Sequence, residues 1–87
     1  MEIGYRPSFI RQLNTLEPDL REEVIETIEE FRNPLNHRHL RVHALSGKLK
    51  GFYSFSVNYR YRIVFTWVGK GKQLAAFAAV GDHDLYR

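Results

Sequence analysis

The fold is decided by residues 53–80, which read YSFSVNYRYRIVFTWVGKGKQLAAFAAV. Apolar and polar side chains alternate over residues 53–57 and again over 61–67, a period of two that is typical of strands with one buried face. Residues 74–80 are apolar throughout and predict a buried central strand. The breaks between these segments carry Asn58 and a Gly-Lys-Gly-Lys run, so we expect consecutive strands joined by hairpins.

Two helices are predicted ahead of these strands. Over residues 9–17 the apolar side chains fall at helical spacing, and a proline interrupts the pattern at the next position. Over residues 20–31 one apolar stripe lies apart from five glutamates, which is typical of a surface helix. Asp19 followed by Glu22 resembles a capping box at the start of this helix, and the Asn-Pro pair at 33–34 predicts its end.

The remaining elements complete the predicted fold. Ile3 and Tyr5 alternate with other residues and predict a short strand, and the alternation of period two begins again at Leu40 and Val42. The order strand, helix, helix, strand, strand, strand (βααβββ) predicts an α+β fold. In it, the N-terminal strand and the helical hairpin pack on one face of a small antiparallel sheet. The chain of 87 residues suffices for a single domain, 1–87.

Composition excludes several classes of chemistry. The chain has no cysteine, so disulfides, thiolate catalysis and cysteine-ligated zinc are excluded, and we expect a protein of the reducing cytoplasm. Its longest apolar run, residues 74–80, is too short to cross a bilayer, and its first residues lack the apolar core of a signal peptide. We therefore expect no membrane partner.

Charge is segregated along the chain. Residues 31–81 contain nine Lys or Arg and no Asp or Glu, whereas residues 1–30 contain eight acidic residues and three arginines. A concentrated positive field attracts polyanions, so nucleic acid is the first partner to consider. The alternative is that these basic side chains only solvate the outer face of a sheet. The residues that we expect to contact phosphates, without reading sequence, are Arg41, Lys48, Lys50 and Arg60.

The sheet face turned away from the helices is the predicted functional face. If the apolar residues of the two alternating strands point toward the helices, then Ser54, Ser56 and Arg62 point away from them. Small hydroxyl side chains beside an arginine make a shallow polar floor. The acidic second helix is expected behind the sheet, away from any anion bound on that floor.

The histidines His37, His39 and His43 do not predict a metal site. No Asp, Glu or Cys lies close to them in sequence. The spacing of His39 and His43 brings ligands together on a helix, whereas this segment is typical of a strand. We expect no metal and no other cofactor.

Three segments resemble one known family. They are LSGKLKGFY at residues 45–53, YRIVF at 61–65 and VGDHDLY at 80–86. With the order of elements, they make nearly the whole chain similar to the RelE/ParE superfamily of type II toxin–antitoxin toxins. The resemblance implies the RelE-like microbial RNase fold and a cognate antitoxin that covers the basic face. It also implies operator DNA as a partner only of the toxin–antitoxin complex.

The superfamily divides by activity. RelE-like members are metal-independent endoribonucleases that cut messenger RNA in the ribosomal A site, whereas ParE-like members act on DNA gyrase and lack the nuclease residues. The matching positions favour the RelE-like branch, with mRNA and the ribosome as partners. The residues that the resemblance implies as catalytic are Arg62 at the scissile phosphate, His83 as acid–base, Tyr86 as the closing aromatic and His43 as a second acid–base candidate.

Metal-free cleavage of RNA requires a base for the ribose 2′-OH, stabilisation of charge at five-coordinate phosphorus, and an acid for the leaving 5′-oxygen. Arginine suits the phosphate because its planar fork matches two oxygens, and histidine suits proton transfer. Ser54 and Ser56 stand where RelE has lysines, so the general base stays open. The alternatives are a ParE-like inhibitor of gyrase and a degenerate toxin that only binds an antitoxin and operator DNA.

Overall fold

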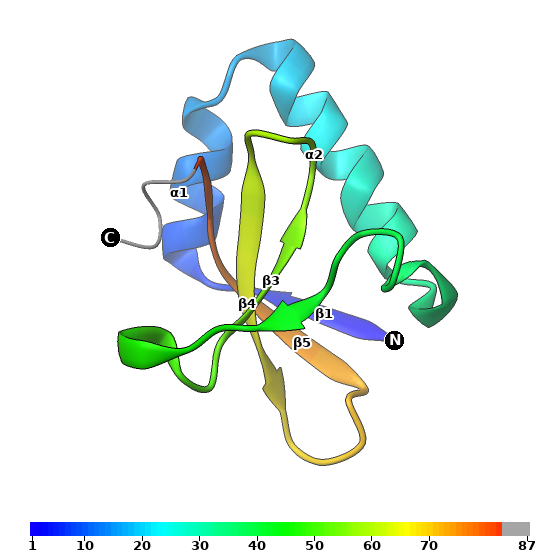
Figure 1. Cartoon of the computed structure of the whole chain (residues 1–87). Coiled ribbons are helices and arrows are strands. Elements are labelled where there is room, and N and C mark those ends of the chain that lie inside the picture. Colours follow the sequence, from blue (N-terminus) through cyan, green and yellow to red (C-terminus); the bar gives the residue numbers. More distant parts are fainter. Residues whose placement is uncertain (83–87) are drawn as a thin grey trace.

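The computed structural model describes residues 1–82. Helices and strands follow one another along these residues, with short 3-10 helices in the connections (Figure 1). The helices are α1 (Pro7–Thr15) and α2 (Pro18–Phe31), and the 3-10 helices are η1 (Pro34–Asn36) and η2 (Gly47–Leu49). The strands are β1 (Glu2–Tyr5), β2 (His43–Ala44), β3 (Tyr53–Ser56), β4 (Arg62–Val68) and β5 (Leu74–Gly81).

The strands form one sheet in the order β1-β5-β4-β3-β2. Neighbouring strands are antiparallel except at one edge, where β1 runs parallel to β5. The predicted α+β class is therefore confirmed, although the sheet is mixed and not antiparallel throughout. β1 leads into α1 at Pro7 and so forms no hairpin, and it pairs with β5 at the edge of the sheet that the hairpins leave free.

The core lies between the helices and one face of the sheet. Its fully buried rings include Phe9 from α1, Phe31 from α2 and Phe77 from β5. The centroid of the Phe31 ring lies 4.5 Å from that of Phe55 and 5.4 Å from that of Phe77, so α2 contacts β3 and β5 through one side chain. Each buried ring removes a large area from water, which a short chain needs. The predicted packing of the helical hairpin on one face is confirmed.

The start of α2 differs from the predicted capping box. Its N-cap residue is Glu17, which makes no side-chain cap bond and is followed by Pro18 within the first turn. Asp19 lies inside that turn. The prediction of a cap at Asp19 is wrong because proline, whose φ is already fixed near the helical value, starts the helix before it.

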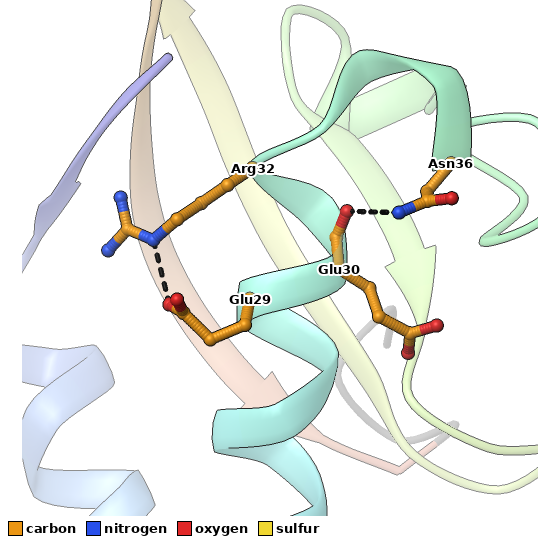
Figure 2. A network of polar contacts seen from close by, with 4 residues as sticks. All are labelled: Glu29, Glu30, Arg32 and Asn36. Atoms are coloured by element: carbon orange, nitrogen blue, oxygen red, sulfur yellow. Dashed lines mark hydrogen bonds and ion pairs between the residues drawn. The ribbon is translucent and has the colours of Figure 1, made fainter.

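Side chains fix the end of α2 (Figure 2). Asn36 Nδ2 donates a hydrogen bond to the carbonyl oxygen of Glu30 at 2.8 Å, which ties η1 to the last turn of the helix. Arg32 Nε lies 2.8 Å from Glu29 Oε2, but both side chains are exposed, so this ion pair contributes little to stability. The helix ends at Phe31, just before the Asn-Pro pair that predicted its end.

Residues 37–41 form turns instead of the predicted strand, and β2 is only two residues long. The side chain of Leu40 is buried in the core, and its amide donates to the carbonyl oxygen of Asn36 at 2.9 Å. Arg41 then takes a left-handed backbone conformation with φ of 61°. The alternation of apolar residues here arises from a turn that buries Leu40.

A β-bulge in β5 changes which of its residues face the core. The pairing with β4 shifts between Val64 and Phe65, which leaves Ala78 without an opposite residue. Phe77 and Val80 are therefore both buried, although residues at this spacing in a regular strand point to opposite faces. The bulge explains how residues three apart in β5 both reach the core.

Side chains of α1 bind the backbone of β5 beyond the end of β1. Ser8 Oγ donates to the carbonyl oxygen of Ala78 at 2.7 Å, and the amide of Val80 donates to Gln12 Oε1 at 2.9 Å. These bonds satisfy backbone groups of the bulge that β1 does not reach. α1 thus holds the segment that leads to Gly81.

Candidate nucleic-acid interface

Arg62 lies at the start of β4, on the sheet face opposite the helices. Its Nη1 atom donates a hydrogen bond to Ser56 Oγ at 2.7 Å, and the two residues are register partners across β3 and β4. A guanidinium has five N–H donors in a rigid fork, so this bond orients the group and leaves capacity for a ligand. The prediction that Ser56 and Arg62 share the outer face is confirmed.

Arg62 lines a hollow of about 280 Å³ together with Arg41, Ser56, Asn58 and Tyr59. We call it the arginine hollow. Tyr59 is 90% exposed beside it. Two arginines next to a hydroxyl group can bind a phosphodiester, because planar guanidinium groups match phosphate oxygens.

Arg41 reaches the hollow through an unusual backbone conformation. Its φ of 61° is left-handed, which for a residue with a Cβ is strained by roughly 1–2 kcal/mol. Two backbone bonds of 2.9 Å hold the turn, from the Val42 amide to the His37 carbonyl and from the Ser56 amide to the Leu40 carbonyl. Strain that surrounding bonds maintain is typical of functional positions, and here it turns the chain toward the arginine hollow.

His43 lies on the same face, in the next row of side chains. It is the register partner of Ser54, whereas Arg62 is the partner of Ser56. Strand spacing and rise put the Cα atoms of His43 and Arg62 roughly 12 Å apart. The Nδ1 atom of His43 lies 2.8 Å from the carbonyl oxygen of Arg41, which can only accept, so in the neutral ring Nδ1 carries the proton. His43 thus keeps an unprotonated Nε2 but does not line the arginine hollow.

The other predicted phosphate contacts lie outside this hollow. Lys48 is in η2 and lines a separate hollow of about 270 Å³, and Lys50 is exposed after it. Arg60 is exposed, with its Cζ atom 5.7 Å from the centroid of the Tyr61 ring. Among these basic residues the structure brings only Arg41 together with Arg62, and the phosphate contacts of the others stay predictions.

Two details of the outer face differ from the prediction. Ser54 is fully buried and Val64 beside it nearly so, which makes the open floor narrower than expected and leaves Ser56 as its hydroxyl group. The acidic helix is not entirely remote, because Glu23 Oε1 accepts a hydrogen bond from Asn58 Nδ2 at 2.9 Å. One carboxylate therefore lies close to the arginine hollow and reduces its positive potential.

His83 and Tyr86 lie outside the described residues, so their catalytic roles stay predictions. The nearest described part of the chain is the end of β5. Gly81 there is the register partner of Arg62, so β5 ends in the same row of the sheet as the arginine hollow.

Asn58 is a residue of the hollow that sequence reasoning took only for a turn. Its Oδ1 atom accepts hydrogen bonds from the amides of Arg60 at 2.9 Å and Tyr61 at 2.8 Å, which shapes the β3–β4 connection. Its position in the sequence could have indicated this, because a residue in the tight turn between Ser56 and Arg62 must lie close to both.

In the part of the chain that the structure describes, the side chains gathered in the arginine hollow are hydrogen-bond donors, which suit a phosphate and not a metal ion. Within residues 1–82, no cluster of three or more His, Asp or Glu side chains is placed to hold a metal ion. His37 Nε2 lies 2.8 Å from the carbonyl oxygen of Phe31, and His39 Nε2 lies 3.9 Å from Glu30 Oε1. The helices in this part of the chain are also too short or too polar to span a membrane.

Solved structures share this fold. The RelBE2 toxin–antitoxin complex from Mycobacterium tuberculosis matches with a TM-score of 0.72 at 19% identity, over 94% of this chain and 96% of the other. The YoeB–YefM complex from Staphylococcus aureus gives 0.69 at 17%, over 95% and 97%. The RelBE complex from E. coli gives 0.67 at 13%, over 93% and 94%. At these identities the likeness shows the fold alone, which is that of the RelE-like α+β toxins.

The sequence then shows the family. A family model described as the RelE-like toxin of type II toxin-antitoxin system HigB matches residues 8–78, which include both arginines of the arginine hollow. The chain belongs to this family of RelE-like HigB toxins, and its predicted place in the RelE/ParE superfamily is confirmed. No curated protein sequence matches it.

Proposed function

We propose that this chain is a cytoplasmic toxin that cleaves messenger RNA on the ribosome by metal-independent acid–base catalysis. The observation that carries the proposal is the arginine hollow. Arg62 and Arg41 both line it, and the hydrogen bond to Ser56 orients the Arg62 guanidinium there. Membership in a RelE-like family supports it. A cognate antitoxin is the protein partner that we propose, because solved structures with this fold include toxin–antitoxin complexes.

The chemistry assigns the arginines a defined role. In metal-free cleavage the ribose 2′-oxygen attacks phosphorus and the 5′-oxygen leaves, which gives a 2′,3′-cyclic phosphate and a free 5′-hydroxyl. Negative charge grows on the phosphoryl oxygens in between. Arg62 and Arg41 donate hydrogen bonds to these oxygens, and Ser56 already holds the Arg62 group in place. Loss of one such donor group typically lowers the rate by ~10²–10³-fold.

The proton transfers are assigned to histidines. By its place in the terminal motif of the family, His83 is proposed as the principal acid–base residue and Tyr86 as the residue that orients the nucleotide. His43 is the second candidate, because its Nε2 lone pair can take the proton of the 2′-OH. Tyr59, exposed beside the arginine hollow, offers a ring on which a base can stack.

Transcript mapping after induction tests this proposal. We expect wild-type protein to produce broken messenger RNA and Arg62→Ala to cut at least ~10²-fold more slowly in single-turnover cleavage on ribosomes. Lys70→Ala is the matched control, because it removes the same charge from an exposed position in the β4–β5 hairpin and should cut at the wild-type rate. Intact transcripts with broken DNA would overturn the proposal in favour of gyrase inhibition. Intact transcripts and intact DNA would indicate a degenerate toxin.

A further inference from the structure

Two hollows lie past the C-terminal end of α2, on the helical side of the sheet. One has a volume of about 350 Å³ and the other about 440 Å³, and both are lined by His37, Trp67 and Lys72. Arg38 and Tyr53 also line the second, which reaches His43 at the edge of the sheet. Figure 1 shows that the end of β4 and the β4–β5 hairpin extend beyond the last turn of α2, so the helix leaves this part of the face uncovered. We call the combined depression the tryptophan groove.

The floor of the tryptophan groove is a set of rings packed on one another. The His37 ring lies 4.4 Å from the Phe31 ring and nearly parallel to it, and its Nε2 bonds the Phe31 carbonyl oxygen. The Trp67 ring lies 6.1 Å from that of Phe31 and 6.3 Å from that of Tyr53. A nucleobase needs a free ring face for stacking, whereas these rings already pack against each other. The floor therefore suits an apolar side chain.

The rim of the groove is positively charged. Within residues 1–82 the ion pairs join Arg32 to Glu29 and His39 to Glu30. Arg38 and Lys72 therefore have no acidic partner among these residues. The sequence from residue 31 to 81 contains no Asp or Glu at all. Cations over an apolar floor complement a segment that carries both carboxylates and large apolar side chains.

One exposed aliphatic residue extends the apolar surface beside the groove. Leu35 is 87% exposed and follows Pro34, which lines the first hollow. Val68, 45% exposed, follows Trp67 on β4, so its side chain lies on the other face of the sheet and does not border the groove. The exposed side chain of Leu35 enlarges the apolar area that the groove offers to another protein.

We propose that the tryptophan groove binds an extended acidic segment of the cognate antitoxin, with an apolar side chain on Trp67 and carboxylates against Arg38 and Lys72. The inference rests on the proposed function only in that it requires an antitoxin. The groove and the arginine hollow lie on opposite faces of the sheet. A segment bound in the groove therefore anchors the antitoxin without occupying Arg62.

Fluorescence tests this proposal, because Trp67 is the single tryptophan of the chain and reports on the groove directly. The probe is the synthetic peptide acetyl-EDLFEDL-amide, which contains no tryptophan. We expect it to change the Trp67 emission in a saturable manner, with Kd raised at least ~10-fold in the Arg38→Glu/Lys72→Glu variant. The control is Arg6→Glu/Arg11→Glu, which changes net charge equally at exposed positions near the start of the chain and should bind as wild type does.

Unchanged emission at millimolar peptide, or equal affinity of the Arg38→Glu/Lys72→Glu variant, would overturn the proposal. A hexauridylate RNA that changes the Trp67 emission and displaces the peptide would assign the groove to RNA and overturn it as well. Cleavage assays on the same proteins separate this proposal from the proposed function. If wild-type protein binds the peptide but cuts no RNA, the groove proposal stands and the proposed nuclease function fails. The Arg38→Glu/Lys72→Glu variant is expected to bind the peptide weakly and still cut RNA.

Discussion

Replacement of Arg41 by glycine should separate stability from phosphate binding. Arg41 holds a φ of 61°, where a Cβ atom crowds the following carbonyl. Relief of this strain stabilises the folded state by ~1–2 kcal/mol. Glycine also has greater conformational freedom in the unfolded chain, which destabilises the folded state by ~0.5–1 kcal/mol. The free energy of unfolding of Arg41→Gly should therefore equal that of wild type or exceed it by up to about 1.5 kcal/mol.

Arg41→Ala is the informative comparison, because it keeps the Cβ atom and the strain while it removes the guanidinium. We expect the alanine variant to be less stable than the glycine variant by about 1 kcal/mol, or about 4–8 °C in Tm for a domain of this size. Both variants lack the second guanidinium of the arginine hollow, so each should bind a short single-stranded RNA ~10–100-fold more weakly than wild type. Calorimetry and fluorescence anisotropy at fixed salt measure the two quantities.

Lys72 provides an internal control, since it also has a left-handed backbone, with φ of 53°, and lies outside the arginine hollow. Lys72→Gly should raise stability over Lys72→Ala in the same way and leave RNA affinity unchanged. Equal thermal midpoints for Arg41→Gly and Arg41→Ala would refute the claim of strain. Wild-type RNA affinity in either variant would refute the contact between Arg41 and phosphate.

Two further predictions follow from particular hydrogen bonds and charges. Gln12→Ala removes the acceptor of the Val80 amide, which belongs to a residue only 3% exposed, and should lower the free energy of unfolding by ~1–3 kcal/mol, measured by urea denaturation. Gln12→Glu keeps an acceptor oxygen and should lose less stability. Equal losses in the two variants would contradict the role of this hydrogen bond. Arg62→Ala should flatten the dependence of log Kd for single-stranded RNA on log salt by about 0.7, the share of one neutralised phosphate. An unchanged slope would exclude a phosphate contact by Arg62, and Lys70→Ala serves as the control.

The layers of the fold were predictable because helices and strands bury residues at different intervals. The stripe of α2 led correctly to Phe31 in the core, and the alternation in β4 placed Arg62 on the opposite face. The parallel pairing of β1 with β5 was not predictable, since it depends on which sheet edge is free once the hairpins have formed. The strand expected at residues 39–43 failed because a turn that buries Leu40 gives the same local alternation.

The site was predictable only in part, for a similar reason. Ser56 and Arg62 flank one tight turn, so their contact follows from the hairpin. Arg41 enters the arginine hollow through a left-handed φ, which arginine rarely adopts and which no sequence pattern marks. The bulge in β5 likewise depends on bonds from α1 that form only in the assembled molecule.

The neighbouring positions of β1 and β5 have a consequence for how the toxin is made. Ser8 and Ala78, which share a hydrogen bond, are 70 residues apart in the chain. Contacts between such distant segments slow folding, because a long loop must close before they form. On the ribosome β5 emerges after the other strands that the structure describes, and until then β1 lacks the strand with which it pairs and Phe77 is missing from the interior. A chain that has not yet released β5 therefore lacks the strand that pairs with β4 at Arg62.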